Sequence, residues 1–141
     1  MYYLKKRKEE KMKKEVIFSE KVPLPGGQYS QAIKVGDFIF TSGQTARDLK
    51  SGKILSPGDI EAQTDIIMRN IETLLNESGA SLSDVVKSSV FIDDHCKFKL
   101  FNNVYKKYFP GDPPVRTAVA IGNFEEGMCI EIDVIAWTPK K

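Results

Sequence analysis

The amino-acid sequence predicts an α+β domain: a single mixed β-sheet with two helices on one face, in the order β-β-β-α-β-α-β-β. Two segments carry apolar side chains at helical spacing, and six short segments alternate or are rich in β-branched residues. Helices and strands each have an apolar face that must be buried against another layer. The 141 residues, 41% of them hydrophobic, are enough for one such domain and too few for two.

Three short strands are expected before the first helix. The segments 15–18, 31–35 and 38–42 carry the strand pattern, and a Gly-Asp pair separates the second from the third. Such a pair favours a tight two-residue hairpin turn. A polar loop over 47–56 follows and leads to the helix.

The first helix is expected to begin at Ser56 and Pro57. Serine is a favourable N-cap, and proline suits the first helical position, where no amide donor is needed. Gly79 is expected to end the helix in a left-handed conformation. The apolar stripe between these limits consists of Ile60, Ile67, Ile71, Leu74 and Leu75.

The second helix is expected between Asp94, a capping residue, and Pro110, which cannot continue it. The strand 85–92 precedes this helix, and the strands 115–121 and 128–138 follow it. The apolar stripe of the helix is entirely aromatic: Phe98, Phe101, Tyr105, Tyr108 and Phe109.

The last two strands combine polar and apolar side chains. Alternation divides each strand into two faces. The more aliphatic faces, expected to pack under the helices, hold Val115, Thr117, Val119 and Ile121 in one strand and Ile130, Ile132, Val134 and Ala136 in the other. The opposite faces hold Arg116, Ala118 and Ala120, and Glu131, Asp133, Ile135 and Trp137.

Arg116 and Glu131 are therefore expected side by side on the second face. A short hairpin between the two strands would place them opposite each other or one diagonal step apart, about 7–8 Å. Ala118, Ile135 and Trp137 share that face and make it too apolar for open water. We expect a second copy of the chain to cover it, so that the two charged residues line a cleft between subunits.

The chemistry of these two side chains suits a small carboxylate substrate. Arg116 offers a planar fork of donors that stays charged, which matches a carboxylate. Glu131 can orient a water molecule or accept its proton, particularly where burial raises its pKa. A structural ion pair between Arg116 and Glu131 explains the same pattern equally well.

Charge divides the chain at residue 14. Residues 1–14 hold seven basic and two acidic side chains, and residues 15–141 hold 14 basic and 17 acidic ones, a net charge of −3. We expect a basic extension over 1–14 and a single domain over 15–141. An acidic domain argues against a nucleic-acid groove. With no apolar run long enough for a membrane span or a secretory signal, we expect a cytoplasmic protein with both cysteines reduced.

The only histidine, His95, lies between a strand and a helix, where a capping or loop role is expected. A metal site there would need several ligands from elsewhere, so no metal is predicted. Cys96 and Cys129 are expected to be buried small hydrophobic residues and not nucleophiles.

An ordered set of short motifs spans nearly the whole chain, from about residue 15 to residue 137. In chain order the motifs are Gly27-Gln28-Tyr29-Ser30-Gln31-Ala32, Thr41-Ser42-Gly43-Gln44, Gln63 with Asn70, Asp84-Val85-Val86-Lys87, Asn102 with Tyr105-Lys106-Lys107-Tyr108-Phe109, Pro114-Val115-Arg116-Thr117 and Ile130-Glu131-Ile132. This set resembles the RidA/YjgF family, also called endoribonuclease L-PSP or translation inhibitor.

The resemblance implies a chorismate-mutase-like homotrimer with clefts between subunits, working without a cofactor. Active members are 2-iminobutanoate/2-iminopropanoate deaminases, which hydrolyse reactive imines and enamines to 2-keto acids and ammonia. Carried over, Arg116 binds the substrate carboxylate and Glu131 positions or activates water. Tyr29, Ser42, Asn102 and the backbone of Ala118 border the substrate.

The sequence departs from the family pattern at two of these positions. Many members have proline where this chain has Gln28, and cysteine where it has Ala118. The second difference removes a thiol from the expected pocket. Two alternatives to the deaminase stay open: a ribonuclease or translation inhibitor, and a non-catalytic trimer that binds small carboxylates.

Overall fold

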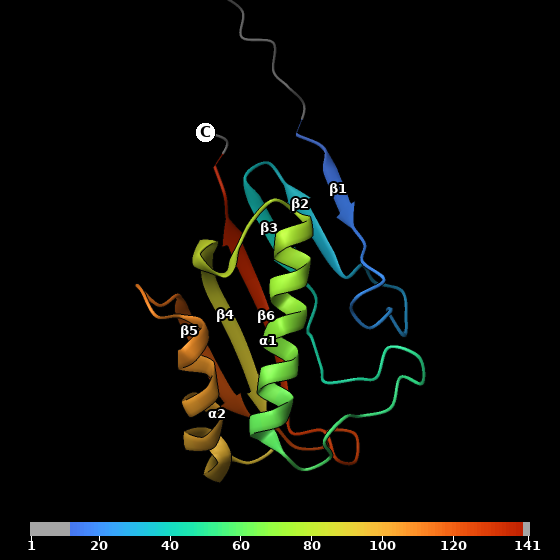
Figure 1. Cartoon of the computed structure of the whole chain (residues 1–141), viewed down its shortest axis with the longest axis vertical. Helices are drawn as coiled ribbons and strands as arrows, with labels where there is room; N and C mark the ends of the chain where they lie inside the picture. Colours follow the sequence, from blue (N-terminus) through green and yellow to red (C-terminus); the bar gives the residue numbers. More distant parts are fainter. Residues whose placement is uncertain (1–11, 140–141) are drawn as a thin grey trace, which may run out of the picture.

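A computed structural model describes residues 12–139 of the chain. Figure 1 shows a twisted sheet with two helices packed across it. The six strands are ordered β1-β2-β3-β6-β4-β5, with β4 and β5 parallel and the other neighbours antiparallel. The elements are β1 (Lys14–Ile17), β2 (Ala32–Val35), β3 (Phe38–Thr41), α1 (Ile60–Glu77), β4 (Val85–Ile92), α2 (Phe98–Tyr105), β5 (Val115–Ala120) and β6 (Ile130–Trp137), with short 3₁₀ turns η1 (Leu82–Asp84), η2 (His95–Lys97) and η3 (Lys106–Tyr108).

The predicted fold class and element order are confirmed. Both helices lie on the same side of the sheet (Figure 1). The core forms between this side of the sheet and the apolar stripes of α1 and α2. Its largest fully buried side chains include Phe101, Ile39, Ile67, Ile71 and Ile132. Tight packing in this layer fixes the strands that carry the candidate site.

The β2–β3 hairpin has the predicted two-residue turn. Val35 pairs with Phe38, and Gly36 between them has a φ of 57°, which glycine adopts without strain.

The start of α1 differs from the prediction. Asp59, not Ser56, is the N-cap, and its side chain accepts a hydrogen bond from the Ala62 amide at 3.0 Å. Ser56 instead has a φ of 47° within a turn that leads into the helix. Both residues are good caps by type, and the turn geometry decides between them. Gly79 has a φ of 81° just after the helix, as expected.

Asp94 caps the second helical segment as predicted, by accepting a hydrogen bond from the Cys96 amide at 2.8 Å. His95 is exposed in η2, immediately after this cap. Cys129 is buried, but Cys96 is exposed, so its predicted burial is wrong. Cys96 lies in η2, and the sequence spacing alone does not indicate that its side chain is exposed there.

The predicted hairpin between the last two strands is wrong. β5 pairs with β4 in parallel, and β6 pairs with the other edge of β4, so β4 lies between them. A parallel neighbour requires a crossover, and α2 provides it in a β4-α2-β5 unit. The following segment, 121–129, then carries the chain back past β4, and β6 inserts between β3 and β4.

The basic extension predicted for residues 1–14 lies mostly outside the described residues. Lys14 belongs to β1 and pairs with Val35, so the sheet already includes the last residue of that segment. Of the helices within 12–139, none combines the length and apolar character needed to cross a bilayer.

Candidate active site

Arg116 points toward the helices and not toward the opposite face of the sheet. Its backbone pairs with Ser88 of β4, which is fully buried under α2. The Arg116 Nη1 donates a hydrogen bond to Asn102 Oδ1 of α2 at 2.9 Å. Arg116 and Asn102 are therefore brought together as the resemblance implied, with Ala118 two residues along the same face of β5.

The Arg116 guanidinium makes cation–π contacts with three aromatic rings of α2. Its Cζ is 4.9 Å from the ring centroid of Tyr105 and 5.3 Å from those of Phe98 and Phe101. Cation–π contacts of this kind each contribute about 0.5–2 kcal/mol, more where water is excluded. The three rings contact the guanidinium, and Asn102 accepts a hydrogen bond from one of its nitrogens.

Tyr105 is itself held in place by a hydrogen bond to β4. Its hydroxyl forms a buried 2.5 Å hydrogen bond with the Ser88 hydroxyl. Burial raises the pKa of Tyr105, and the Ser88 hydrogen bond and the Arg116 charge oppose that shift. The phenol therefore stays neutral beneath the guanidinium, and the cation keeps its charge for a ligand.

Glu131 lies on the other face of the sheet, against the end of β3. Its carboxylate packs onto the Cα of Gly43, so closely that a Cβ at residue 43 would overlap Oε1 and lie 2.8 Å from Cδ. Burial raises the pKa of Glu131, the Asp133 carboxylate raises it further, and Arg47 opposes the shift. A carboxyl group with a raised pKa is suited to accept a proton near neutral pH.

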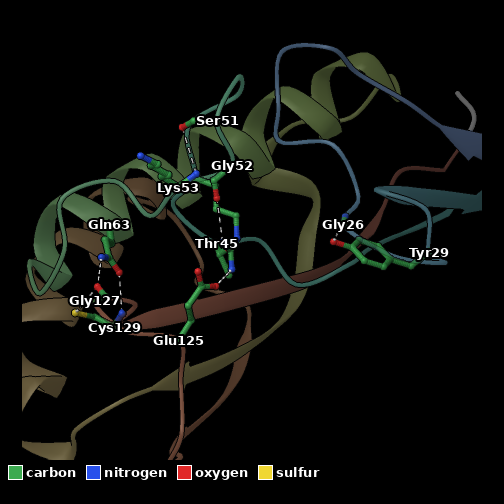
Figure 2. A network of polar contacts seen from close by, with 11 residues as sticks. Gly26, Tyr29, Thr45, Ser51, Gly52, Lys53, Gln63, Glu125, Gly127 and Cys129 are labelled. Atoms are coloured by element: carbon green, nitrogen blue, oxygen red, sulfur yellow. Dashed lines mark hydrogen bonds and ion pairs between the residues drawn. The ribbon is translucent and has the colours of Figure 1, made fainter.

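A cavity of about 370 Å³ opens beside Gly43, lined by Tyr29, Ser42, Gln44, Arg47 and neighbouring loop residues. The Tyr29 hydroxyl accepts a hydrogen bond from the Gly26 amide at 3.1 Å, which closes the loop around the ring (Figure 2). The Ser42 hydroxyl donates to the Gln31 carbonyl at 3.2 Å. Tyr29 and Ser42 line this cavity, and Glu131 packs against Gly43 in its wall, so the three form a second group of predicted site residues.

Two half-sites result, which replace the predicted side-by-side arrangement. The arginine half-site consists of Arg116, Asn102 and Ala118 under α2. The glutamate half-site consists of Tyr29, Ser42 and Glu131 around Gly43. The two half-sites lie on opposite faces of the sheet. Arg116 is registered to Ser88, Ser88 is registered to Val134, and all three side chains face the helices. Glu131 is three residues from Val134 in β6, so the alternation of that strand directs its side chain to the other face.

The face of the sheet away from the helices is apolar and open. Trp137 pairs with Phe38 there, and Ile135 pairs with Phe40. The prediction placed Ala118 and Ala120 on this face, but the pairing of β5 with β4 turns them toward the helices. The open face carries Val115 and Val119 instead. The exposed large apolar side chains of this face are Val16, Phe38, Phe40, Val115, Val119 and Trp137.

Three contributors to the site were not predicted from the sequence. The aromatic stripe of α2 indicated only a core helix, and nothing in its spacing points to Arg116. Gly43 belongs to a motif, but its contact with Glu131 depends on the β3–β6 pairing. Arg47 falls in a segment that reads as a polar loop, so no local signal identifies it.

Comparison with known proteins places these residues in a family. The family model of endoribonuclease L-PSP matches residues 19–138. A RutC family protein of Pyrococcus abyssi is 48% identical over 89% of this chain and 98% of its own. The chloroplastic Reactive Intermediate Deaminase A of Arabidopsis thaliana is 38% identical over 89% of this chain and 66% of its own.

Solved structures agree with this relationship. A putative endoribonuclease of Thermotoga maritima has a TM-score of 0.83 at 36% identity and covers 89% of this chain and 98% of its own. RidA from an Antarctic Psychrobacter species has a TM-score of 0.81 at 32% identity and covers 87% of this chain and 98% of its own. The chain belongs to the endoribonuclease L-PSP family, which includes RidA and the RutC family proteins.

Proposed function

We propose that the protein hydrolyses reactive 2-imino and enamine acids, such as 2-iminobutanoate and 2-iminopropanoate, to 2-keto acids and ammonia. The proposal depends most on one observation: the Arg116 side chain is held in place but has no acidic partner in the described part of the chain. The guanidinium is held by three rings and Asn102, yet among residues 12–139 it makes no ion pair. A fixed, partly exposed cation with free donors is a site for a carboxylate.

The active unit in this proposal is a homotrimer in which each cleft is shared by two protomers. Arg116 and Glu131 of one chain face opposite sides of the sheet and cannot contact one small substrate. The open apolar face needs a cover, and copies of the same chain supply one. One protomer would then contribute its arginine half-site and its neighbour the glutamate half-site.

The chemistry requires no cofactor in this arrangement. Arg116 binds the substrate carboxylate, and Asn102 keeps the guanidinium in place. An enamine first tautomerises to the imine. Glu131 then orients a water molecule and accepts one of its protons as the oxygen attacks the electrophilic imine carbon. Glu131 returns that proton to the imine nitrogen, which gives a neutral carbinolamine. Glu131 then takes the hydroxyl proton and passes it to the amine as the C–N bond breaks, so that ammonia leaves and the 2-keto acid remains.

Two relatives support the substrate class. The Arabidopsis relative is named a reactive intermediate deaminase. The solved structure of E. coli TdcF, 30% identical with a TM-score of 0.80, holds bound serine, a small amino acid with a free carboxylate. The name of the first relative and the ligand of the second are both compatible with a cleft that binds a carboxylate next to a reacting nitrogen.

The test is ammonia release from 2-iminobutanoate, generated in situ by a threonine dehydratase, compared with the spontaneous rate. The wild-type protein should accelerate release, and Arg116→Ala should abolish the excess. Arg69→Ala, which removes an exposed arginine on the outer side of α1, serves as the matched control and should keep full activity. No acceleration by the wild-type protein, together with carboxylate binding that Arg116→Ala abolishes, would identify a non-catalytic binding protein instead.

A further inference from the structure

The cavity of the glutamate half-site contains a cation that the proposed reaction does not use. Arg47 is the only charged residue among the described residues that line it. The other lining residues are apolar or neutral and include Leu24, Tyr29, Gln44 and Thr45. A single guanidinium in a neutral cavity is a candidate anion contact.

The Arg47 guanidinium is held by three acceptors. Its Nε donates to Thr45 Oγ1 at 3.2 Å, and its Nη1 donates to the Gly52 carbonyl at 3.0 Å. Its Nη2 pairs with Glu125 at 2.5 Å. Thr45, Gly52 and Glu125 converge from two loops in Figure 2. A guanidinium carries five N–H donors, so two remain for a ligand.

The ion pair with Glu125 does not cancel this capacity. The Glu125 side chain is 55% exposed, and an ion pair in contact with water contributes only about 0–1 kcal/mol. Glu131 is not among the residues that line the cavity, but the charge of Arg47 reaches it and lowers the pKa of its carboxyl against the effect of burial. The guanidinium is therefore held by Thr45, Gly52 and Glu125, and its charge acts on the group proposed to react.

The cavity is larger than a short imino acid needs. Its volume of about 370 Å³ falls within the usual range of small-molecule pockets, about 300–1,000 Å³. A three- or four-carbon substrate fills only part of such a volume. A longer side chain could reach Arg47.

We propose that Arg47 is a specificity-determining residue that binds a second carboxylate, so that 2-imino acids with an acidic side chain are preferred substrates. This inference rests on the proposed deaminase function and assigns its substrate class. The substrate then meets one arginine at each end, with the imine carbon near Glu131 between them. Neutral imino acids of the same length lack the second contact.

The experiment compares two imines of equal chain length. 2-Iminoglutarate and 2-iminopentanoate are generated in situ by amino-acid oxidases from L-glutamate and L-norvaline, with catalase present, and ammonia release above the spontaneous rate is measured. The wild-type kcat/KM should be at least tenfold higher for 2-iminoglutarate. Arg47→Gln should reduce this ratio about tenfold or more, as expected for one charge-assisted contact.

Two further variants sharpen the test. Lys53→Gln removes a nearby exposed positive charge outside the cavity and should leave the ratio unchanged. Glu125→Gln frees Arg47 from its partner and should raise the ratio. If wild-type protein turns over both imines with a ratio near one, or Arg47→Gln lowers both rates equally, the assignment of Arg47 is wrong and the deaminase proposal survives. If neither imine is accelerated, the deaminase proposal itself is wrong.

Discussion

Arg116 and Glu131 lie on opposite faces of one sheet, with strand β4 between the strands that carry them. Arg116 is registered to Ser88, beneath α2, and Glu131 is registered to Phe91, whose side chain faces away from the helices. No rotamer change brings the two groups together in one protomer. If they act on one substrate, they do so across an interface between two copies of the chain.

The open apolar face should therefore be the assembly surface. Phe40→Glu places a charge among exposed aromatic and aliphatic side chains of β3, β5 and β6. We expect this variant to sediment as a monomer and to lose deaminase activity while it keeps its helical circular dichroism. Burying an unpaired charge in an interface costs several kcal/mol, enough to prevent association.

Asn76→Glu introduces the same charge on an exposed position of α1, away from this face. It should leave the oligomeric state unchanged. A Phe40→Glu protein that still assembles as the wild type does would show that another surface mediates association.

The contact between Gly43 and Glu131 should be essential for catalysis. An alanine Cβ at residue 43 would overlap the carboxylate and force it away from its position. A displacement of about 1 Å is enough to lower kcat/KM roughly 100-fold. Gly111→Ala, where an added Cβ meets nothing within 4 Å, is the matched control and should retain wild-type kinetics. Equal kcat/KM values for the two variants would show that the Gly43 contact does not position Glu131 for catalysis.

The three aromatic rings of α2 should hold the Arg116 guanidinium in position. Tyr105→Phe keeps the ring but leaves the buried Ser88 hydroxyl without its partner, so the free energy of unfolding should fall by about 1–3 kcal/mol with little change in KM. Tyr105→Leu also removes the ring 4.9 Å from the guanidinium and should raise KM several-fold. Steady-state kinetics and denaturant unfolding separate the two effects. A KM that is the same in both variants would mean that the ring does not support the guanidinium.

The raised pKa of Glu131 has opposite consequences for activity and stability. Activity requires the ionised carboxylate, so kcat/KM should decline as pH falls through a pKa above the ordinary value of 4.5. The folded protein binds the Glu131 proton more tightly than the unfolded chain does, so the contribution of this group to stability is present below 4.5 and is lost as pH rises through the raised pKa.

Glu131→Gln should accordingly be more stable than the wild type at pH 8 and nearly equal to it below about pH 4. Its kcat/KM should be low and should lack the acidic limb. Thermal unfolding and rate measurements across this range check both expectations. A variant that is less stable at pH 8 would show that the carboxylate is stabilised, not penalised, by its surroundings.

The sequence pattern predicts local structure well where caps and periodicity agree. The strand 85–92 was predicted with the bounds that β4 has, and Asp94 and Gly79 limit their helices as expected. At Ser56 and Asp59, two capping residues compete, and the turn geometry selects the second.

The strand pairing could not be predicted in the same way. Alternation in 115–121 and 128–138 fits a hairpin and a crossover equally, because it fixes two faces for each strand but not which face meets the helices. The parallel register of Arg116 with Ser88 resolves that choice and reverses the predicted face of Arg116. The resemblance named the candidate site residues, while their arrangement in two half-sites required the three-dimensional structure.

The most direct test of a shared site is complementation between two inactive proteins. Arg116→Ala and Glu131→Gln are purified separately, unfolded and refolded together in equal amounts, and ammonia release from 2-iminobutanoate is measured. Random assembly pairs an intact Arg116 with an intact Glu131 of the neighbouring protomer in about a quarter of the clefts. Recovery of about a quarter of the wild-type rate is expected, and a mixture as inactive as each parent alone would contradict a cleft built from two protomers.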